Sequence, residues 1–245
     1  MQKLRLRYAK RGPLRFTSHR DVARAFERAL RRAKVPMAYS QGFNPHPKIS
    51  WIGASPTGVA SEAEYVEIQV VEELDPDALV QMLDMAMPPG LDLLEAVVAD
   101  GGTLADRMEA SRWRIELPGV APDVLRAAFA QVMAAEVVEV ERLTKHGMRT
   151  IDARAAIITG CVEDDPTASP STPPADPCGI LVVVVRQLTP AVRPDDVLSA
   201  LRVVAALEPP VPAKATRMAQ GRLDDGGSLS DPLAPDWAAR VSTSG

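Results

Sequence analysis

The sequence has 245 residues, 46% of them hydrophobic, and a formal net charge of -4 at pH 7. It can bury one large core or two small ones, and no apolar run approaches the ~20 residues that span a membrane. The charged N-terminus is unlike a signal peptide, so we expect a cytoplasmic protein with no membrane contact. Cys161 and Cys178 are too few for a cysteine-only zinc site or an iron–sulfur cluster.

The charge is distributed unevenly along the chain. Residues 1–50 contain thirteen Lys and Arg against two acidic residues, whereas the remainder contains fifteen basic and thirty acidic residues. This asymmetry is typical of a protein that binds a polyanion, above all a nucleic acid, at one end. A solvated basic face, or one that docks on the protein's own acidic half, is the alternative interpretation.

The first expected element is a strand over residues 3–8. Its two-residue period places Leu4, Leu6 and Tyr8 on one sheet face and predicts a wet, positive face on the other side. That positive face would carry Lys3, Arg5 and Arg7. After a turn at Gly12-Pro13, residues 14–16 resume an extended pattern.

A helix is expected from Ser18 to about Lys34. Ser18 and Asp21 resemble a capping box, and Pro36 stops the helix. The buried stripe would consist of Val22, Ala23, Phe26, Ala29 and Leu30. The outer face would then carry Arg20, Arg24, Arg28, Arg31 and Lys34.

Residues 35–51 contain three prolines and Gly42, which predict an extended loop. A strand at 65–70, a helix that begins at Asp75-Pro76, and a strand at 91–98 follow. The resulting β-α-β-β-α-β order is that of a ferredoxin-like, or split-βαβ, domain.

The second half of the chain has a similar rhythm. Strand patterns occur at 113–117, 137–143, 150–158, 180–185 and 213–218, and helical patterns at 122–134 and 194–201. We therefore predict an α+β protein of tandem ferredoxin-like domains with antiparallel sheets, spanning residues 1–100 and 108–222. A Pro- and acid-rich insertion at 163–178 and a tail at 223–245 are predicted to be disordered.

The loop from Tyr39 to Lys48 offers groups that suit single-stranded RNA. Tyr39 and Phe43 could stack on bases, Asn44 could read a base edge, and Lys48 could contact a phosphate. A proline-stiffened structural loop with two buried aromatic rings is the alternative. The predicted RNA-binding residues are Lys3, Arg5, Arg7, Arg15, Arg20, Arg24, Arg28, Arg31, Tyr39, Gln41, Phe43, Asn44, His46 and Lys48.

His19 and His46 are the candidates for catalysis. A metal-independent RNA-cleaving site needs a general base and a general acid near neutral pH, and imidazole supplies both. Alternatively, His19 is a polar residue of a first helical turn and His46 bonds only to the backbone. No metal-ligating His spacing exists, so no metal site is expected. Asp152 and Arg154 would share one face of the strand at 150–158, which favours a structural ion pair over a site.

Two stretches of the sequence resemble a known family. Arg5, Tyr8, Gly12 and the run Arg15-Phe16-Thr17-Ser18-His19, followed by Tyr39-Ser40-Gln41-Gly42-Phe43-Asn44-Pro45-His46-Pro47-Lys48-Ile49, are similar to the signature of the radical SAM-linked (radical SAM-associated) bacterial family of unknown function. The resemblance covers roughly residues 1–220, most strongly 1–70. Members of that family occur beside or fused to a radical SAM enzyme.

The resemblance implies a non-catalytic accessory protein that binds or presents RNA, such as tRNA or rRNA, to a radical SAM enzyme. The iron–sulfur cluster would belong to that partner, since this chain lacks the three-cysteine motif, and the chain itself is expected to hold no cofactor. One alternative is a metal-independent endoribonuclease similar to the repeat-processing enzymes of CRISPR systems. Another is a pure protein-interaction module whose basic patch holds an acidic partner.

Overall fold

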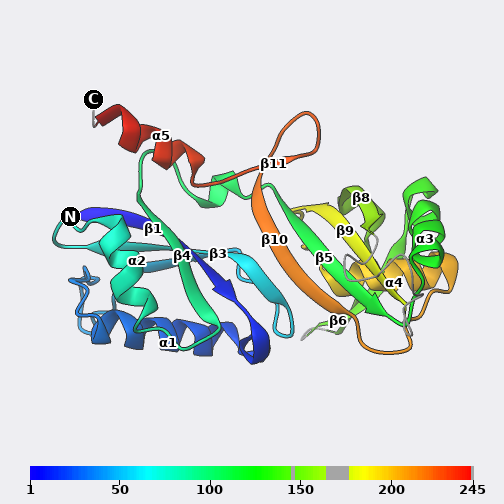
Figure 1. The fold of residues 1–245 in the computed structure, drawn as a ribbon, viewed down its shortest axis with the longest axis horizontal. Coiled ribbons are helices and arrows are strands. Elements are labelled where there is room, and N and C mark those ends of the chain that lie inside the picture. Colours follow the sequence, from blue (N-terminus) through cyan, green and yellow to red (C-terminus); the bar gives the residue numbers. More distant parts are fainter. Residues whose placement is uncertain (145–146, 164–176, 244–245) are drawn as a thin grey trace, which may run out of the picture. The chain divides into compact units, whose positions relative to one another are not determined.

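The computed structural model describes residues 1–144, 147–163 and 177–243 (Figure 1). It shows an α+β protein with five α-helices among these residues. The chain forms two compact units. Unit 1 comprises Met1–Met108, Gln220–Arg222 and Ser230–Gly245, and unit 2 comprises Glu109–Ala219 and Leu223–Leu229. No helix of the described part is long and apolar enough to cross a membrane.

The sheet of unit 1 is built around its first strand. Its strands are β1 (Gln2–Lys10), β2 (Ile49–Ile52), β3 (Ala60–Val70) and β4 (Leu91–Val98). They run in the order β4-β1-β3, β2 also pairs with β3, and these pairings are antiparallel. Alternate residues of β1, namely Leu4, Leu6 and Tyr8, are buried, which confirms the predicted apolar face.

Two helices cover this apolar face of the sheet, α1 (His19–Arg32) and α2 (Pro76–Asp84). Ser18 caps α1 by accepting a hydrogen bond from the backbone N–H of Asp21, and Asp75 caps α2 in the same way. The helix starts were therefore predicted correctly from their caps. The buried stripe of α1 contains Ala25, whereas Ala23, which we expected there, is half-buried.

The segment after β1 differs from the prediction. Gly12–Phe16 form a 3-10 turn (η1) instead of an extended run, with the backbone N–H of Thr17 bonded to Leu14 O at 2.9 Å. The reason is local: Gly12 adopts a φ of 54°, which glycine tolerates, and Pro13 fixes the next φ in the helical range.

The C-terminal segment of the chain also differs from the prediction. Residues 223–245 were expected to be disordered, yet they contain β11 (Leu229–Ser230) and α5 (Ala234–Thr243). Leu233 is buried in a second cluster with Tyr65, Val97 and Leu104, and Trp237 packs against it. This cluster lies on the sheet face opposite α1 and α2, since Tyr65 and Val97 pair with Arg7 and Arg5. Burial of a few apolar side chains orders a segment whose composition is otherwise polar.

Unit 2 contains a second set of paired strands. Its strands are β5 (Ala110–Pro118), β8 (Ile157–Glu163), β9 (Cys178–Arg186) and β10 (Lys214–Leu223), in the order β10-β5-β9-β8. Gln220–Arg222 of β10 are counted with unit 1. Its helices are α3 (Pro122–Ala134), with the bounds that its pattern predicted, and α4 (Pro194–Ala205). A separate hairpin joins β6 (Glu139–Thr144) to β7 (Gly147–Asp152).

The strand expected at 150–158 is interrupted. β7 ends at Asp152, Arg154–Ala156 form a 3-10 turn (η3), and β8 then begins at Ile157. The Asp152 carboxylate accepts the backbone N–H groups of Arg154 and Ala155 at 3.0 and 3.3 Å, and this local bonding competes with a continuous strand. Of the insertion predicted at 163–178, residues 164–176 lie outside the described residues.

Candidate nucleic-acid interface

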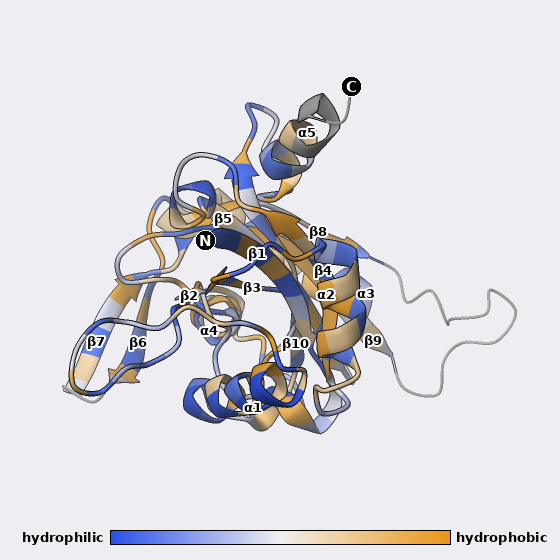
Figure 2. Ribbon diagram, turned by 90° about the vertical axis from the view of Figure 1, so that its left-hand side faces the viewer, coloured by the Kyte–Doolittle hydropathy of each residue, from blue (hydrophilic) through white to orange (hydrophobic). Residues whose placement is uncertain are grey.

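The outer face of α1 is exposed and basic. Arg20, Arg24, Arg28 and Arg31 are all exposed, as is Lys34 just beyond the helix, and Figure 2 shows α1 largely in the blue of hydrophilic residues. Arg24 makes an ion pair with Asp21, at 3.7 Å between exposed side chains, where such a pair is weak. These predicted RNA-binding arginines are therefore accessible to an anionic ligand.

Aromatic packing holds α1 in place beneath this basic face. Phe26 is fully buried, and its ring centroid lies 5.9 Å from that of Tyr8 in β1 and 5.4 Å from that of Trp51 in β2. The edge of Trp51 also contacts the His19 ring, at 5.2 Å between centroids. The basic helix and the strand that follows the 39–48 loop are thus joined through one aromatic cluster.

The loop between Tyr39 and Lys48 is closed at its base. Tyr39 and Pro47 form a β-bridge, and the backbone N–H of Lys48 donates to Ala38 O at 2.8 Å. The tip is exposed, with Phe43 entirely accessible and Tyr39 about half accessible. The alternative that both aromatic rings are buried is therefore wrong. Gln41 and Asn44 are exposed beside Phe43.

The two candidate catalytic histidines have different surroundings. His46 Nδ1 lies 2.9 Å from Ser40 Oγ, and the backbone N–H of His46 donates to the same hydroxyl at 3.1 Å. His19 instead packs on Trp51 at the start of α1. Each contact gives its imidazole a structural role within the loop or the helix start.

The face of β1 that we expected to be exposed to solvent, with Lys3, Arg5 and Arg7, is partly covered. Arg5 is buried, with Nε 2.8 Å from Glu67 and Nη1 2.7 Å from Asp236 of α5, so the expectation of an exposed cation is wrong for Arg5. Burial disfavours its charge, but the hydrogen bonds to Asp236 and Glu67 outweigh burial and raise the pKa of the Arg5 guanidinium. Lys3 is exposed and lies 3.7 Å from Glu67.

Arg7 and Arg15 are intermediate cases. Arg7 Nε lies 2.7 Å from Glu95, which also accepts a hydrogen bond from Trp237 Nε1. Arg15 stacks over the Phe16 ring at 4.7 Å, and its buried Nε has no hydrogen-bond partner among the described residues. Tyr65 lies beside Arg7, and burial of its hydroxyl raises its pKa. The Asp231 carboxylate raises this pKa further, to a smaller extent. Arg7 on the strand face and Arg15 in η1 are therefore both engaged in packing contacts and only partly accessible.

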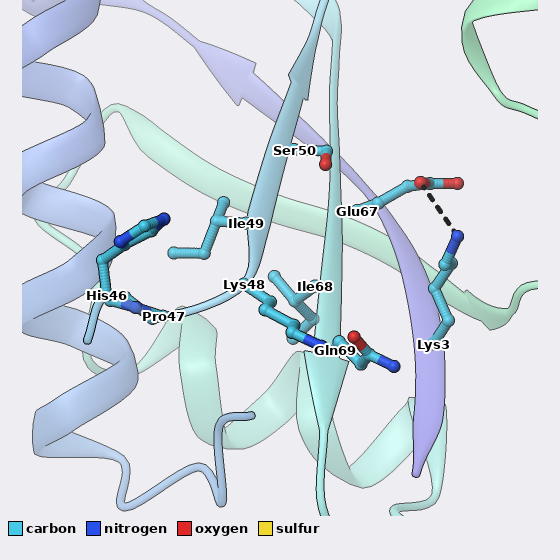
Figure 3. A pocket seen from close by; sticks show the side chains of 9 residues that line it. All are labelled: Lys3, His46, Pro47, Lys48, Ile49, Ser50, Glu67, Ile68 and Gln69. Atoms are coloured by element: carbon cyan, nitrogen blue, oxygen red, sulfur yellow. Dashed lines mark ion pairs between the residues drawn. The ribbon is translucent and has the colours of Figure 1, made fainter. Parts of the chain in front are cut away.

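Two cavities border the 39–48 loop, and Pro47 lines both. One, of about 390 Å³, includes Arg31 and Lys34 at the end of α1 together with Tyr39. The other, of about 260 Å³, is lined by Lys3, His46, Pro47, Lys48, Ile49, Ser50, Glu67, Ile68 and Gln69 (Figure 3). Ser50 and Gln69 were missed by the sequence reasoning, although the strand alternation around Glu67 could have indicated Gln69.

Residues 3–194 match the family of uncharacterized proteins conserved in bacteria (DUF2344). The chain belongs to this family. The match spans α1, the 39–48 loop and both cavities, so the candidate interface lies in the family region of unit 1. No curated protein matches the sequence. The family description contains no link to a radical SAM enzyme.

The Asp152 and Arg154 pair lies inside the same DUF2344 region and has structural contacts. Asp152 also accepts the backbone N–H of Val138 at 3.1 Å, and Arg154 Nη1 donates to Ile157 O at 2.9 Å. The two side chains do not share a strand face, since Arg154 lies in η3. Among the residues that the structure describes, no group of three or more His, Cys, Asp or Glu side chains could hold a metal ion.

Proposed function

We propose that this DUF2344 protein is a non-catalytic accessory protein that binds single-stranded RNA through unit 1 and presents it to a radical SAM enzyme. One observation carries the RNA proposal: the exposed arginines of α1 adjoin a loop that exposes two aromatic rings. Arg31, Lys34 and Tyr39 line the same cavity, which places the helix and the loop side by side. Cations that follow a backbone and rings that accept bases are the two components of single-strand binding.

The dimensions of α1 suit several phosphates. Arg20 and Arg31 are eleven residues apart, which is about 16 Å along a helix axis. Successive phosphates of a stacked strand lie ~3.4 Å apart along the axis, so this length corresponds to about five of them. The four arginines therefore extend over a length that one RNA segment can follow.

The proposal includes the tandem ferredoxin-like arrangement. It is supported by the strand orders, which are β4-β1-β3 with β2 on β3 in unit 1 and β10-β5-β9-β8 in unit 2. In both units, one helix follows the first of these strands and one follows the third, as in a split-βαβ domain. In this arrangement helices cover one sheet face of each unit. The radical SAM partner is supported by the resemblance of Arg15–His19 and the 39–49 run alone.

Reversing three charges on α1 should weaken RNA binding. For about five neutralised phosphates, we expect the logarithm of the affinity to fall against the logarithm of salt with a slope near about −3.5. In the Arg24→Glu/Arg28→Glu/Arg31→Glu variant the slope should become shallower, with a magnitude of about 1.4 or smaller, because at least three phosphate contacts are lost. The measurement is a titration of labelled cellular RNA at several salt concentrations.

The matched control is Arg149→Glu/Arg186→Glu/Arg202→Glu, which changes three exposed arginines of unit 2 and the net charge by the same amount. Equal losses in both variants would contradict an interface on α1. The same samples are inspected for cleavage. RNA cleavage in the absence of metal ions would favour the endoribonuclease hypothesis. If no RNA binds even at low salt, the protein-interaction module is the remaining hypothesis.

Phe43→Ala should weaken RNA binding without changing stability. Loss of one base–aromatic stack costs about 1–3 kcal/mol of binding free energy. Phe43 is entirely exposed, so the free energy of unfolding should change by less than about 0.5 kcal/mol. Anisotropy titrations and urea unfolding measure the two effects, with Met85→Ala, at an exposed apolar residue after α2, as the control. An unchanged RNA affinity of Phe43→Ala would exclude the loop tip from the interface.

A further inference from the structure

The sheet face of unit 1 that lacks helices α1 and α2 is divided in two. One part is covered, because Leu233, Asp236 and Trp237 contact residues of this face. The other part, around Lys3, is not covered by the described segments of unit 1 and contains the cavity of about 260 Å³ (Figure 3). Lys3 pairs with Gln69, and Glu67 pairs with Ser50, so three adjacent strands contribute side chains to it.

The uncovered part has a net positive charge although a carboxylate lines it. Glu67 is neutralised by Arg5 at 2.8 Å and approached by Lys3 at 3.7 Å. Asp236 forms ion pairs with both Arg5 and Arg107, the latter at 2.8 Å, so Asp236 alone does not neutralise the charge of Arg5. The cavity itself is lined by the cations Lys3 and Lys48 and by one carboxylate, that of Glu67. Because Arg5 already pairs with Glu67, the two lysines remain as an excess of positive charge.

Lys48 contributes an accessible positive charge to this cavity. Its side chain is exposed, and no carboxylate within the described ranges forms an ion pair with it. Figure 3 shows the Lys48 side chain extending toward Gln69, on the side where Lys3 also lies. The amide of Gln69 and the hydroxyl of Ser50 also line the cavity and add neutral hydrogen-bond donors.

We propose that this cavity binds the phosphate monoester of a single nucleotide. A monoester carries about −1.5 to −2 charges at pH 7 and three acceptor oxygens, which matches the two ammonium groups and the neutral donors. The volume lies just below the ~300–1,000 Å³ of pockets for drug-sized ligands, so it suits one nucleotide and not a longer segment. A backbone phosphodiester has one charge and would satisfy fewer of these groups.

The inference rests on the proposed function for the origin of the nucleotide, which would be the phosphorylated end of the bound RNA. Pro47 lines both this cavity and the one next to α1, so the two cavities meet at this residue of the 39–48 loop. A free mononucleotide has the same chemistry, and the experiment separates the two sources.

The test compares hexauridylates that carry a phosphate at the 5′ end, at the 3′ end or at neither, together with uridine monophosphate, by competition at one fixed salt concentration. One phosphorylated form should bind about tenfold more tightly than the hydroxyl form, which corresponds to ~1.4 kcal/mol. In Lys48→Met and Lys3→Met/Lys48→Met this ratio should approach one. In the control Arg24→Met/Arg28→Met the affinities of all three hexauridylates should fall while the tenfold ratio persists, and the affinity of uridine monophosphate should stay unchanged.

A wild-type ratio near one, with no binding of uridine monophosphate, would overturn the phosphate site while the RNA interface on α1 stands. Conversely, binding of uridine monophosphate that Lys48→Met abolishes, without binding of the hydroxyl hexamer, would support the site with a free nucleotide as its ligand and reject the RNA interface. Lys48 is exposed and has no ion pair in the described chain, so Lys48→Met should fold normally. Thermal unfolding of this variant checks that.

Discussion

Asp236→Ala should destabilise unit 1 by about 3–5 kcal/mol, the usual cost of removing one partner from a buried ion pair. The Asp236 side chain is fully buried and pairs with Arg5 at 2.7 Å and Arg107 at 2.8 Å. It also accepts the backbone N–H of Asp100 at 2.9 Å. Its removal leaves two buried guanidinium groups without their shared carboxylate.

The measurements are urea unfolding followed by tryptophan fluorescence, to which Trp51, Trp113 and Trp237 all contribute, and amide hydrogen exchange of peptides from β1 and α5. We expect α5 to exchange first, because Asp236 is its charged anchor to the sheet. Asp225→Ala, at an exposed carboxylate of the 224–228 turn, is the control and should change stability by less than about 0.5 kcal/mol. A similarly small change in Asp236→Ala would show that the paired arginines find other partners.

Phe26→Ala should cost about 3–5 kcal/mol of stability, since it leaves a cavity in a fully packed core. Its ring contacts Tyr8 and Trp51, so the substitution loosens α1, β1 and β2 together. Because α1 carries the basic face, RNA affinity should fall as well, although Phe26 itself is inaccessible to RNA.

Phe43→Ala separates these effects, since it removes an equally large ring from an exposed position. Urea unfolding should distinguish the two variants clearly, whereas RNA titration should show a loss in both. If Phe26→Ala unfolds at the same urea concentration as the wild type, the aromatic cluster does not anchor α1. If it is destabilised but binds RNA normally under native conditions, the basic face does not depend on this anchor.

Elements with strong local signals were predictable from the sequence. α1 begins after Ser18 because that side chain caps it, and its apolar stripe of period 3.6 is visible in the sequence. α3 has a proline at its first position and ends where the pattern ends. β1 follows the two-residue alternation of its apolar and basic residues. The turns η1 and η3 were not predicted, since short hydrogen-bonded turns leave only a weak trace in hydrophobic periodicity.

The candidate site was predictable in part. Prolines and Gly42 indicated the loop at 39–48, and the exposed arginines of α1 follow from its buried stripe. The cavity beside Lys48 was not predictable, because Lys3, Ser50 and Gln69 meet only when β1, β2 and β3 pair in one register.

Alternation and capping act between residues a few positions apart, so the sequence by itself determined where β1, α1 and α3 lie and that residues 1–50 are basic. The tertiary structure alone decided which of those cations remain in contact with water. Arg5 and Asp236 are 231 positions apart, and no local pattern indicates that they pair. That ion pair forms only when α5 packs on the sheet. Arg5, which was predicted to bind RNA, is therefore buried as an anchor of α5, whereas Lys3 and Lys48 remain exposed.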